Sequence, residues 1–594
     1  MRKHLALIAV LALLLSLFSA CGSKPDTAAP DSTAAPTNQP AATPAASKTP
    51  DPAEEATPAP VDEGPYNYAV GKYEVDANGY PISTYEYELP LTTTDETFTY
   101  WTANFTPQYV PEEGYSAIDY YKGFKEYTGV NIEYIVVSYN TRGENFAALL
   151  ASDDLPDIFS HGTYLYTSGT LDQAVDDGYY VNIYDYKDYC PNYMYYVVNY
   201  DKADERTKAS VFFEPEMIVA FYALYDGYYT SIDLQARGDW LKDLGMTNDD
   251  IVTYDDVYDM LVAMKSQYDT CEYPYAPWYM IDGARSFVAY DTMAYITVYN
   301  TLSYYVVDNE IKMINIGEND KELMQMFNKW WADGLVDPNY AGYTQSSSCE
   351  AGILNGQIGF TIMHSSENEG YESRSVDADT QWVPIKKPLR YPGQVLHYNC
   401  WAARTSLGNI SVSAKCPNIE LAVTWLDWRY SPFGADYTAW GPEGIVWEYD
   451  ENGEKTCTDW AMKNPDGIAL TWVLKLFGFN VIVDGGIEIM KRNFAYPGGE
   501  RYYDISTYWN DLNYDGAYDI SPMFKLTTEE KNELAQYTTD IATYQSEMLP
   551  QFFDGSKPFS EWDSYVQTMY DQMDLGKVFD IYQTAYDNYL AGLG

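Results

Sequence analysis

This chain of 594 residues has few basic side chains and very few histidines. It carries 36 Lys and Arg against 87 Asp and Glu, which gives a formal net charge of −51, and it has only 4 His. Nucleic-acid binding needs clusters of Lys and Arg, so we expect no nucleic-acid partner. The charge also argues against strongly anionic ligands, unless a local Arg site overrides the overall field.

The chain also lacks the short motifs of several common enzyme classes. No HExxH, GxSxG or GxxxxGK[ST] occurs, so the zincin, α/β-hydrolase and P-loop classes have no support. No CxxC occurs, which argues against a zinc ribbon or a redox motif. Besides Cys21, six cysteines permit several disulfide pairings between which the sequence does not choose: Cys190, Cys271, Cys349, Cys400, Cys416 and Cys457.

The start of the chain has the features of an export signal. Three basic residues, Arg2 to His4, precede an apolar run from Leu5 to Leu17, which is shorter than the roughly 20 residues that span a bilayer. The following Ser-Ala-Cys21 resembles a bacterial lipobox, although Phe18 stands where Leu is usual. The resemblance implies cleavage before Cys21 and lipid on its thiol, including palmitate. The alternative is a plain signal peptide.

From Thr97 onward the pattern is typical of parallel α/β structure. Phe98–Trp101 predicts a strand, Tyr115–Thr128 a helix that Gly129 ends, and Val130–Val137 a second strand. Strand, helix and strand in this order indicate a parallel unit.

Later segments predict helices with clear boundaries. Thr253–Asp256 matches a capping box, and Lys321–Asp333 is a helix that Gly334 closes. Apolar residues at intervals of three and four around Leu534 and Ile541 predict a long amphipathic helix. The composition provides enough apolar residues for a core, and the length predicts more than one core.

Six segments between Thr97 and Leu593 carry a further signal: Phe124–Val130, Ala151–Asp157, Arg237–Gly245, Trp331–Pro338, Gly441–Tyr449 and Ala585–Tyr586. In this order they resemble the extracellular solute-binding proteins of bacterial ABC importers, of the large Gram-positive lipoprotein type. The resemblance implies an α/β fold of two Rossmann-like lobes, joined by crossover hinge strands as in type II periplasmic binding proteins, with the ligand between them.

The resemblance also implies lobes built from discontinuous segments. The Ile358–Ile362 stretch resembles a strand that returns to the first lobe. We expect a signal peptide at 1–20, a lipid-anchored tether at 21–65, a loosely ordered lead-in at 66–96, a first lobe at 97–222 and 360–434, and a second lobe at 223–359 and 435–594.

Aromatic residues are abundant, with 61 Tyr, 15 Trp and 21 Phe. Rings with a polar edge suit sugars, which have a C–H face bordered by hydroxyls, although most rings must belong to the core. Trp240 and Trp331 match family packing positions, and we expect them in the core. We expect ligand-binding residues at strand ends and turns: Trp101, Asn104, Tyr139, Glu144, His161, Tyr164, Trp278, Arg285, His364, Trp401 and Trp440.

One acidic stretch matches part of a calcium loop. Its residues at alternating positions, around Gly516, suit a structural Ca²⁺: Asp511, Asn513, Asp515, Ala517 and Asp519. Pro522 replaces the usual closing Glu, and the alternative is a surface turn rich in Asx residues.

Taken together, the sequence predicts a lipid-anchored receptor on the extracellular face of the cell membrane. We expect a monomer that captures a small-molecule or oligosaccharide ligand, with a neutral oligosaccharide as first choice, and passes it to ABC permease subunits. We expect no covalent chemistry and no cofactor other than calcium. The alternatives are a peptide receptor of the same fold, a surface enzyme that acts on glycosides, and an adhesin or sensor.

Overall fold

Strands and helices alternate as predicted in the computed structural model, which forms two separate β-sheets. The structure describes residues 64–104, 109–166, 169–277, 285–292, 302–343, 348–398, 403–463, 470–477, 495, 499–521 and 523–592. These residues all belong to one unit, Glu63–Gly594. Within these ranges, no helix is both long and apolar enough to cross a membrane.

The first sheet has five strands in the order β2-β1-β3-β13-β6. Strands β1, β2 and β3 are parallel, whereas β13 is antiparallel to both β3 and β6. Parallel pairing of consecutive strands requires a crossover, and the predicted helix after β1 provides it. The bounds are β1 Thr97–Asn104, β2 Asn131–Ser138, β3 Ile158–Ser160, β6 Phe221–Tyr229 and β13 Ala403–Val412.

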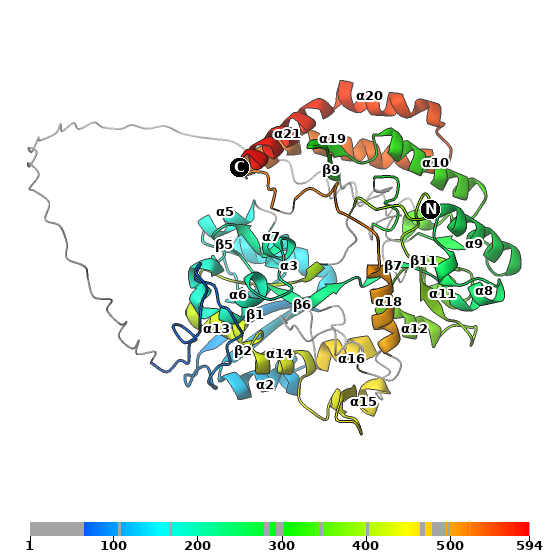
Figure 1. Cartoon of the computed structure of the whole chain (residues 1–594). Coiled ribbons are helices and arrows are strands. Elements are labelled where there is room, and N and C mark those ends of the chain that lie inside the picture. Colours follow the sequence, from blue (N-terminus) through cyan, green and yellow to red (C-terminus); the bar gives the residue numbers. More distant parts are fainter. Residues whose placement is uncertain are drawn as a thin grey trace, which may run out of the picture. The chain divides into compact units, whose positions relative to one another are not determined.

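The second sheet has four strands in the order β12-β7-β11-β8, and β6 leads directly into it (Figure 1). Only Thr230 and Ser231 separate β6 from β7. Beyond its pairing with β3, β13 runs beside β6 as far as Tyr229. The strands β6 and β13 therefore extend past the end of β3 toward the second sheet. The bounds are β7 Ile232–Arg237, β8 Tyr275–Ala276, β11 Phe360–His364 and β12 Trp382–Pro384.

Three two-stranded ribbons lie outside the main sheets. They consist of β4 Phe212–Glu214 with β5 Met217–Ile218, β9 Tyr304–Val307 with β10 Glu310–Met313, and β14 Trp447–Tyr449 with β15 Lys455–Cys457.

Helices account for most of the remaining described structure. Those up to the end of β11 are α2 Asp119–Thr128, α3 Arg142–Ser152, α4 Gly162–Leu165, α5 Leu171–Asp176, α6 Pro191–Val198, α7 Glu205–Val211, α8 Gly238–Asp243, α9 Tyr254–Gln267, α10 Glu318–Ala332 and α11 Glu350–Leu354. Those that follow are α12 Asn368–Glu372, α13 Ile419–Trp428, α14 Pro432–Trp440, α15 Asp459–Met462, α16 Leu470–Phe477, α18 Glu500–Asn510, α19 Thr528–Phe553, α20 Trp562–Gln572 and α21 Leu575–Gly592.

The predicted helix boundaries follow from local hydrogen bonds. Gly129 has φ 75°, and its N–H donates to the carbonyl of Lys125, which ends α2. The Thr253 hydroxyl accepts from the N–H of Asp256, whose carboxylate accepts from the N–H of Thr253, which confirms the capping box of α9. Such a cap stabilises a helix by about 1 kcal/mol.

Each sheet has its own hydrophobic core, as the length predicts. The first core packs α2, α6 and α13 on β1, β6 and β13. The second packs α9, α10, α19, α20 and α21 with β7 and β11. Trp240 is buried in the second core and Trp331 packs against it, which confirms their predicted packing roles.

The lead-in at 66–96 is an integral part of the first core, contrary to its expected loose order. Leu91 and Tyr87 are buried in this core, and five further tyrosines of the segment pack against it. The Tyr87 hydroxyl donates to Oδ2 of Asp427, over 2.8 Å. The same fully buried carboxylate accepts from the backbone N–H groups of Asn192 and Tyr193. A tyrosine can bury its ring and still place its hydroxyl on a polar partner, which is why this polar segment packs so well.

The strand pairing differs from the predicted lobe boundaries. The returning strand β11 was expected in the first lobe, but it pairs with β7 and β8 in the second sheet. Conversely, β6 stays in the first sheet to Tyr229, and α14 joins α2 through the Tyr120 hydroxyl and the Thr438 carbonyl. The remaining lobe boundaries stay predictions.

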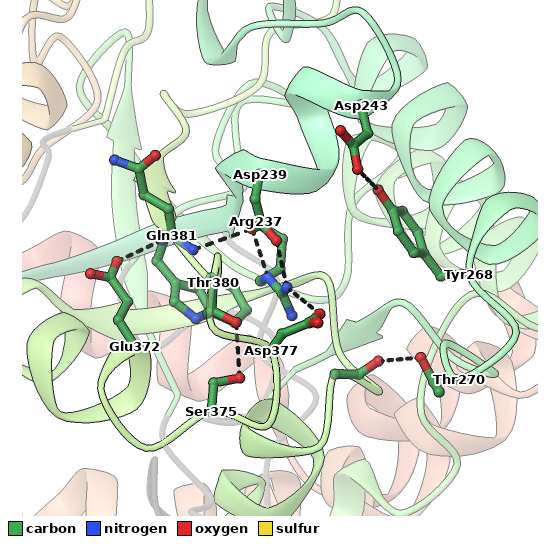
Figure 2. A network of polar contacts seen from close by, with 12 residues as sticks. Arg237, Asp239, Asp243, Tyr268, Thr270, Glu372, Ser375, Asp377, Thr380 and Gln381 are labelled. Carbon is green, nitrogen blue, oxygen red and sulfur yellow. Dashed lines mark hydrogen bonds and ion pairs between the residues drawn. The ribbon is translucent and has the colours of Figure 1, made fainter.

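The segment after α12 is fastened to the second sheet by a polar network (Figure 2). Arg237, at the end of β7, donates two hydrogen bonds to Asp239 and a third to Asp377. The carboxylate of Asp239 also accepts from the N–H of Gln381. Residues 377–381 therefore belong with the second sheet, whose β12 follows at once. The buried Arg237 has a structural role here.

The described cysteines do not form disulfides with one another. Cys190, Cys271, Cys349, Cys416 and Cys457 are all buried as free thiols. Cys400, like Cys21, lies outside the described residues.

Candidate functional site

The carboxyl ends of the three parallel strands place several predicted residues on one edge of the first sheet. Asn104 ends β1, Tyr139 directly follows β2, and His161 directly follows β3. Ligands of open α/β sheets bind outside the carboxyl ends of the strands. Because β6 and β13 extend beyond this edge, it faces the crossing to the second sheet. We call Asn104, Tyr139, Arg142, His161 and Tyr164 the edge cluster.

His161 is the most unusual member of the edge cluster. Its backbone is in the left-handed region, with φ 65°, and its side chain is only 3% exposed. Nδ1 is hydrogen-bonded to the hydroxyl of Tyr164, whereas Nε2 is buried without a hydrogen-bond partner among the described residues. Burial, together with the nearby charge of Arg142, lowers the pKa of His161 to about 3. The imidazole is therefore neutral at physiological pH.

Arg142 packs on Tyr139 within the edge cluster. Its guanidinium lies 3.5 Å from the ring centroid of Tyr139, and Nη1 donates to the Tyr139 carbonyl over 2.6 Å. The Tyr139 ring meets the His161 ring edge-on, with 5.8 Å between centroids. Tyr164 is 40% exposed, and burial of its hydroxyl raises its pKa. A partly exposed ring beside a neutral imidazole suits a polyhydroxylated ligand, because both groups combine an apolar face with a polar edge.

Asn104 is positioned by a neighbouring tyrosine. It is nearly buried, and its Nδ2 donates to the hydroxyl of Tyr115 over 2.6 Å. Its amide thus lies at the end of β1, with its orientation fixed. Glu144, in contrast, is exposed in the first turn of α3.

The second sheet presents a buried ion pair at the end nearest the crossing. Lys387 Nζ lies 2.6 Å from Oδ2 of Asp233, and both side chains are almost fully buried. The Ser286 hydroxyl donates to the other oxygen of Asp233, and Lys387 also donates to the carbonyl of Arg285. A buried pair with this many hydrogen bonds fixes the segments that it joins. It fixes residues 285–288 against the first strand of the second sheet.

Arg285 and His364 lie at the same end of the second sheet. His364 is the last residue of β11 and is paired with Ile232, the first residue of β7. Arg285 is partly exposed with φ 53°, and its Nε is buried without a hydrogen-bond partner among the described residues. The structure therefore brings two predicted ligand-binding residues, Arg285 and His364, to the strand crossing on the side of the second sheet.

Two predicted tryptophans pack in cores instead of facing the strand crossing. Trp101 is 2% exposed and lies 5.5 Å from Phe146, between ring centroids. Trp440 is also buried, against Trp447. Trp278 and Trp401 lie outside the described residues.

The acidic stretch proposed as a calcium loop is paired with basic side chains of the protein. Asp511 binds Lys386 at 2.6 Å, Asp515 binds His397 at 3.0 Å, and Asp519 lies 4.0 Å from Arg285. The Asn513 side chain donates to the Gln394 carbonyl, and the Ala517 N–H donates to Asp515 within the loop. Within the described ranges, no three His, Cys, Asp or Glu residues are grouped as metal ligands. Calcium at this loop stays a prediction.

Sequence reasoning missed Arg142 and Lys387. Arg142 starts α3 only three residues after the predicted Tyr139, and a three-residue 3₁₀ turn returns it over that ring. The spacing of three residues between Tyr139 and Arg142 was the sequence signal that could have predicted their contact. Lys387 gave no such signal, because its partner Asp233 is far away in the sequence.

Comparison with solved structures identifies the fold. An extracellular solute-binding protein from Bifidobacterium longum subsp. infantis aligns with a TM-score of 0.63 and 16% identity, over 83% of this chain and 98% of that chain. The alginate-binding protein AlgQ2 without calcium ion gives 0.61 and 19%, over 84% and 99%. The S. pneumoniae ABC-transporter substrate binding protein FusA in complex with kestose gives 0.59 and 18%, over 84% and 100%. No protein-family model and no curated protein matches the sequence.

The chain therefore has the type II-like α/β fold of ABC-transporter solute-binding proteins. The likeness covers more than four fifths of the chain and nearly all of each neighbour. This confirms the fold class that the sequence predicts.

Proposed function

We propose that this protein captures an oligosaccharide outside the cell and delivers it to an ABC transporter. The observation that carries the proposal is the edge cluster, above all the buried and neutral His161 with an unpartnered Nε2. A neutral imidazole nitrogen can accept from, or donate to, a sugar hydroxyl without the desolvation cost of a charge. The fold supports the same reading, since the neighbours named FusA and AlgQ2 bind saccharides.

The edge cluster would contribute to binding in two ways. The exposed ring of Tyr164 offers an apolar face to the C–H face of a sugar. His161 Nε2 would then provide a hydrogen bond from a ring whose orientation is held by the contact between Nδ1 and Tyr164. In hinged binding proteins, two bodies close around a ligand. Here the first body is the first sheet with its core, the second body is the second sheet with its core, and β6 with β7 would act as one hinge.

Titration calorimetry against a panel of oligosaccharides and peptides tests the proposal. We expect an oligosaccharide to bind, and His161→Phe to weaken binding by about tenfold or more through the lost hydrogen bond. The matched control is His397→Phe, because His397 pairs with Asp515 of the acidic loop and lies outside the edge cluster. Equal affinities of both variants and the wild type would exclude His161 as a ligand contact. If only peptides bind, the ligand is a peptide and the proposed oligosaccharide ligand is wrong.

The remaining features of the proposal concern location. Cys21 would carry a lipid that holds the protein at the outer face of the cell membrane, and the 21–65 segment would act as the tether. A monomeric receptor of this kind performs no covalent chemistry on its ligand.

A further inference from the structure

A pocket of about 720 Å³ lies where elements of both cores meet, and its lining includes no residue of the edge cluster. One wall is formed by Phe212, Phe213 and their neighbours in the β4–β5 ribbon, which follows α7 of the first body. The other is formed by residues 523–531 at the start of α19 and by the end of α21, both in the second body. A volume of this size accommodates a ligand of several hundred Å³.

Two lysines share one aromatic ring in this pocket. Lys525 Nζ and Lys531 Nζ each lie 5.5 Å from the centroid of the Phe213 ring. Lys525 also donates to the carbonyls of Phe212 and Phe213. Neither lysine has a carboxylate within 4.0 Å among the described residues, although the chain has 87 acidic residues. Burial and the nearby charge of Lys531 lower the pKa of Lys525, and the charge of Glu214 opposes this only in part. An added anion would further stabilise the two neighbouring cations.

Among the described residues, none of the acids that line the pocket forms an ion pair with Lys525 or Lys531. Glu530 accepts from the N–H of Thr527 as the capping box of α19, and Glu214 is exposed. Asp172 accepts from the Thr528 hydroxyl at 3.4 Å, while its Oδ1 is buried without a hydrogen-bond partner among the described residues. The third lysine of the pocket, Lys208, is paired with Glu205, which is not among the lining residues.

We propose that this pocket binds the acidic unit of a saccharide, with its carboxylate or sulfate on Lys525 and Lys531 and a ring hydroxyl on Asp172. The proposal rests on the proposed function and adds a charged subsite to it. The donors are suitable because Lys531 makes no side-chain hydrogen bond among the described residues, while Lys525 retains one N–H beyond its two carbonyl partners. Such a local basic site is what an anionic ligand needs in a chain with this negative field.

Matched saccharide pairs test the proposal with the full chain. Titration calorimetry would compare tetragalacturonate with its methyl ester, and sialyllactose with lactose, at low and high salt. We expect the acidic member of at least one pair to bind about tenfold tighter or more, and high salt to reduce this advantage. Lys531→Met should abolish the advantage, whereas Lys577→Met, an exposed residue paired with Asp574, should retain it. The melting temperature of Lys531→Met checks that the variant is folded.

The outcomes separate this proposal from the proposed function. The acidic subsite would be overturned if neutral saccharides bound as tightly as acidic ones, or if Lys531→Met kept the tighter binding of the acidic saccharide. Either result would leave oligosaccharide capture intact. If inorganic sulfate binds and no acidic saccharide does, the pocket is a site for free anions, and the saccharide assignment is overturned. No binding by any saccharide would overturn both proposals.

Discussion

The buried carboxyl group of Asp427 should make the stability of the first body depend on pH. Burial raises its pKa from 3.8 to about 7, despite four hydrogen bonds that favour the ionised form. Between about pH 4 and about pH 7 the folded state therefore binds a proton that the unfolded state has released. Because the folded state binds more protons than the unfolded state in this range, the unfolding free energy falls as pH rises. The contribution of Asp427 is fully lost above about pH 7.

The size of the effect follows from the shift. A difference of about three pKa units corresponds to about 4 kcal/mol of unfolding free energy between about pH 4 and about pH 8. Asp427→Asn cannot titrate, so the difference in unfolding free energy between wild type and Asp427→Asn should change by this amount across the range. Urea titrations at several pH values measure the difference and cancel the contributions of other groups.

Tyr87→Phe provides a second measurement at the same carboxyl group. It removes one of the four hydrogen-bond donors to the Asp427 carboxylate. The unfolding free energy should fall by about 1.5–3 kcal/mol where Asp427 is ionised, and by less at low pH. The control Tyr449→Phe changes an exposed tyrosine and should stay within about 0.5 kcal/mol of the wild type. If the difference in unfolding free energy between wild type and Asp427→Asn does not change with pH, Asp427 stays ionised in the folded state. That result would refute the reasoning.

Three further predictions concern the anchor, the core and the acidic loop. Cys21→Ala should move the protein from the membrane fraction to the medium, and continued tight membrane association would refute the anchor. Trp101→Ala and Trp240→Ala should each cost about 3–5 kcal/mol in urea titrations, and a neutral effect would contradict their burial. Calcium added after chelation should raise the melting temperature if the acidic loop binds the metal in place of Lys386 and His397; an unchanged melting temperature would refute the calcium prediction.

Local signals predicted the elements of this fold well. The hydroxyl of Thr253 and the carboxylate of Asp256 stand three residues apart, so their reciprocal capping can be inferred from the sequence alone. The stop at Gly129 likewise depends only on that residue's freedom to adopt a positive φ. Such features need no information from distant parts of the chain.

Non-local pairing explains what the sequence did not reveal. The position of β11 depends on its pairing with β7, where Phe360 is opposite Ala236, and a short apolar strand fits either sheet equally well. Trp101 lies near the end of β1, yet that strand is buried on both faces between β2 and β3, so closeness to a strand end did not mean exposure. His161 was predicted because it follows a strand, but its unpartnered Nε2 depends on the packing around it.

The packing of residues 66–96 on the first core has a mechanical consequence. Any pull transmitted along the chain from residues before 64 reaches the first body through Tyr87 and its neighbours before it reaches a strand of either sheet. The load is then borne by a buried hydrogen-bonded carboxylate and a layer of tyrosine rings. Thr230 and Ser231, where β6 passes into β7, lie outside this segment, so a pull on it does not act directly on the strand crossing.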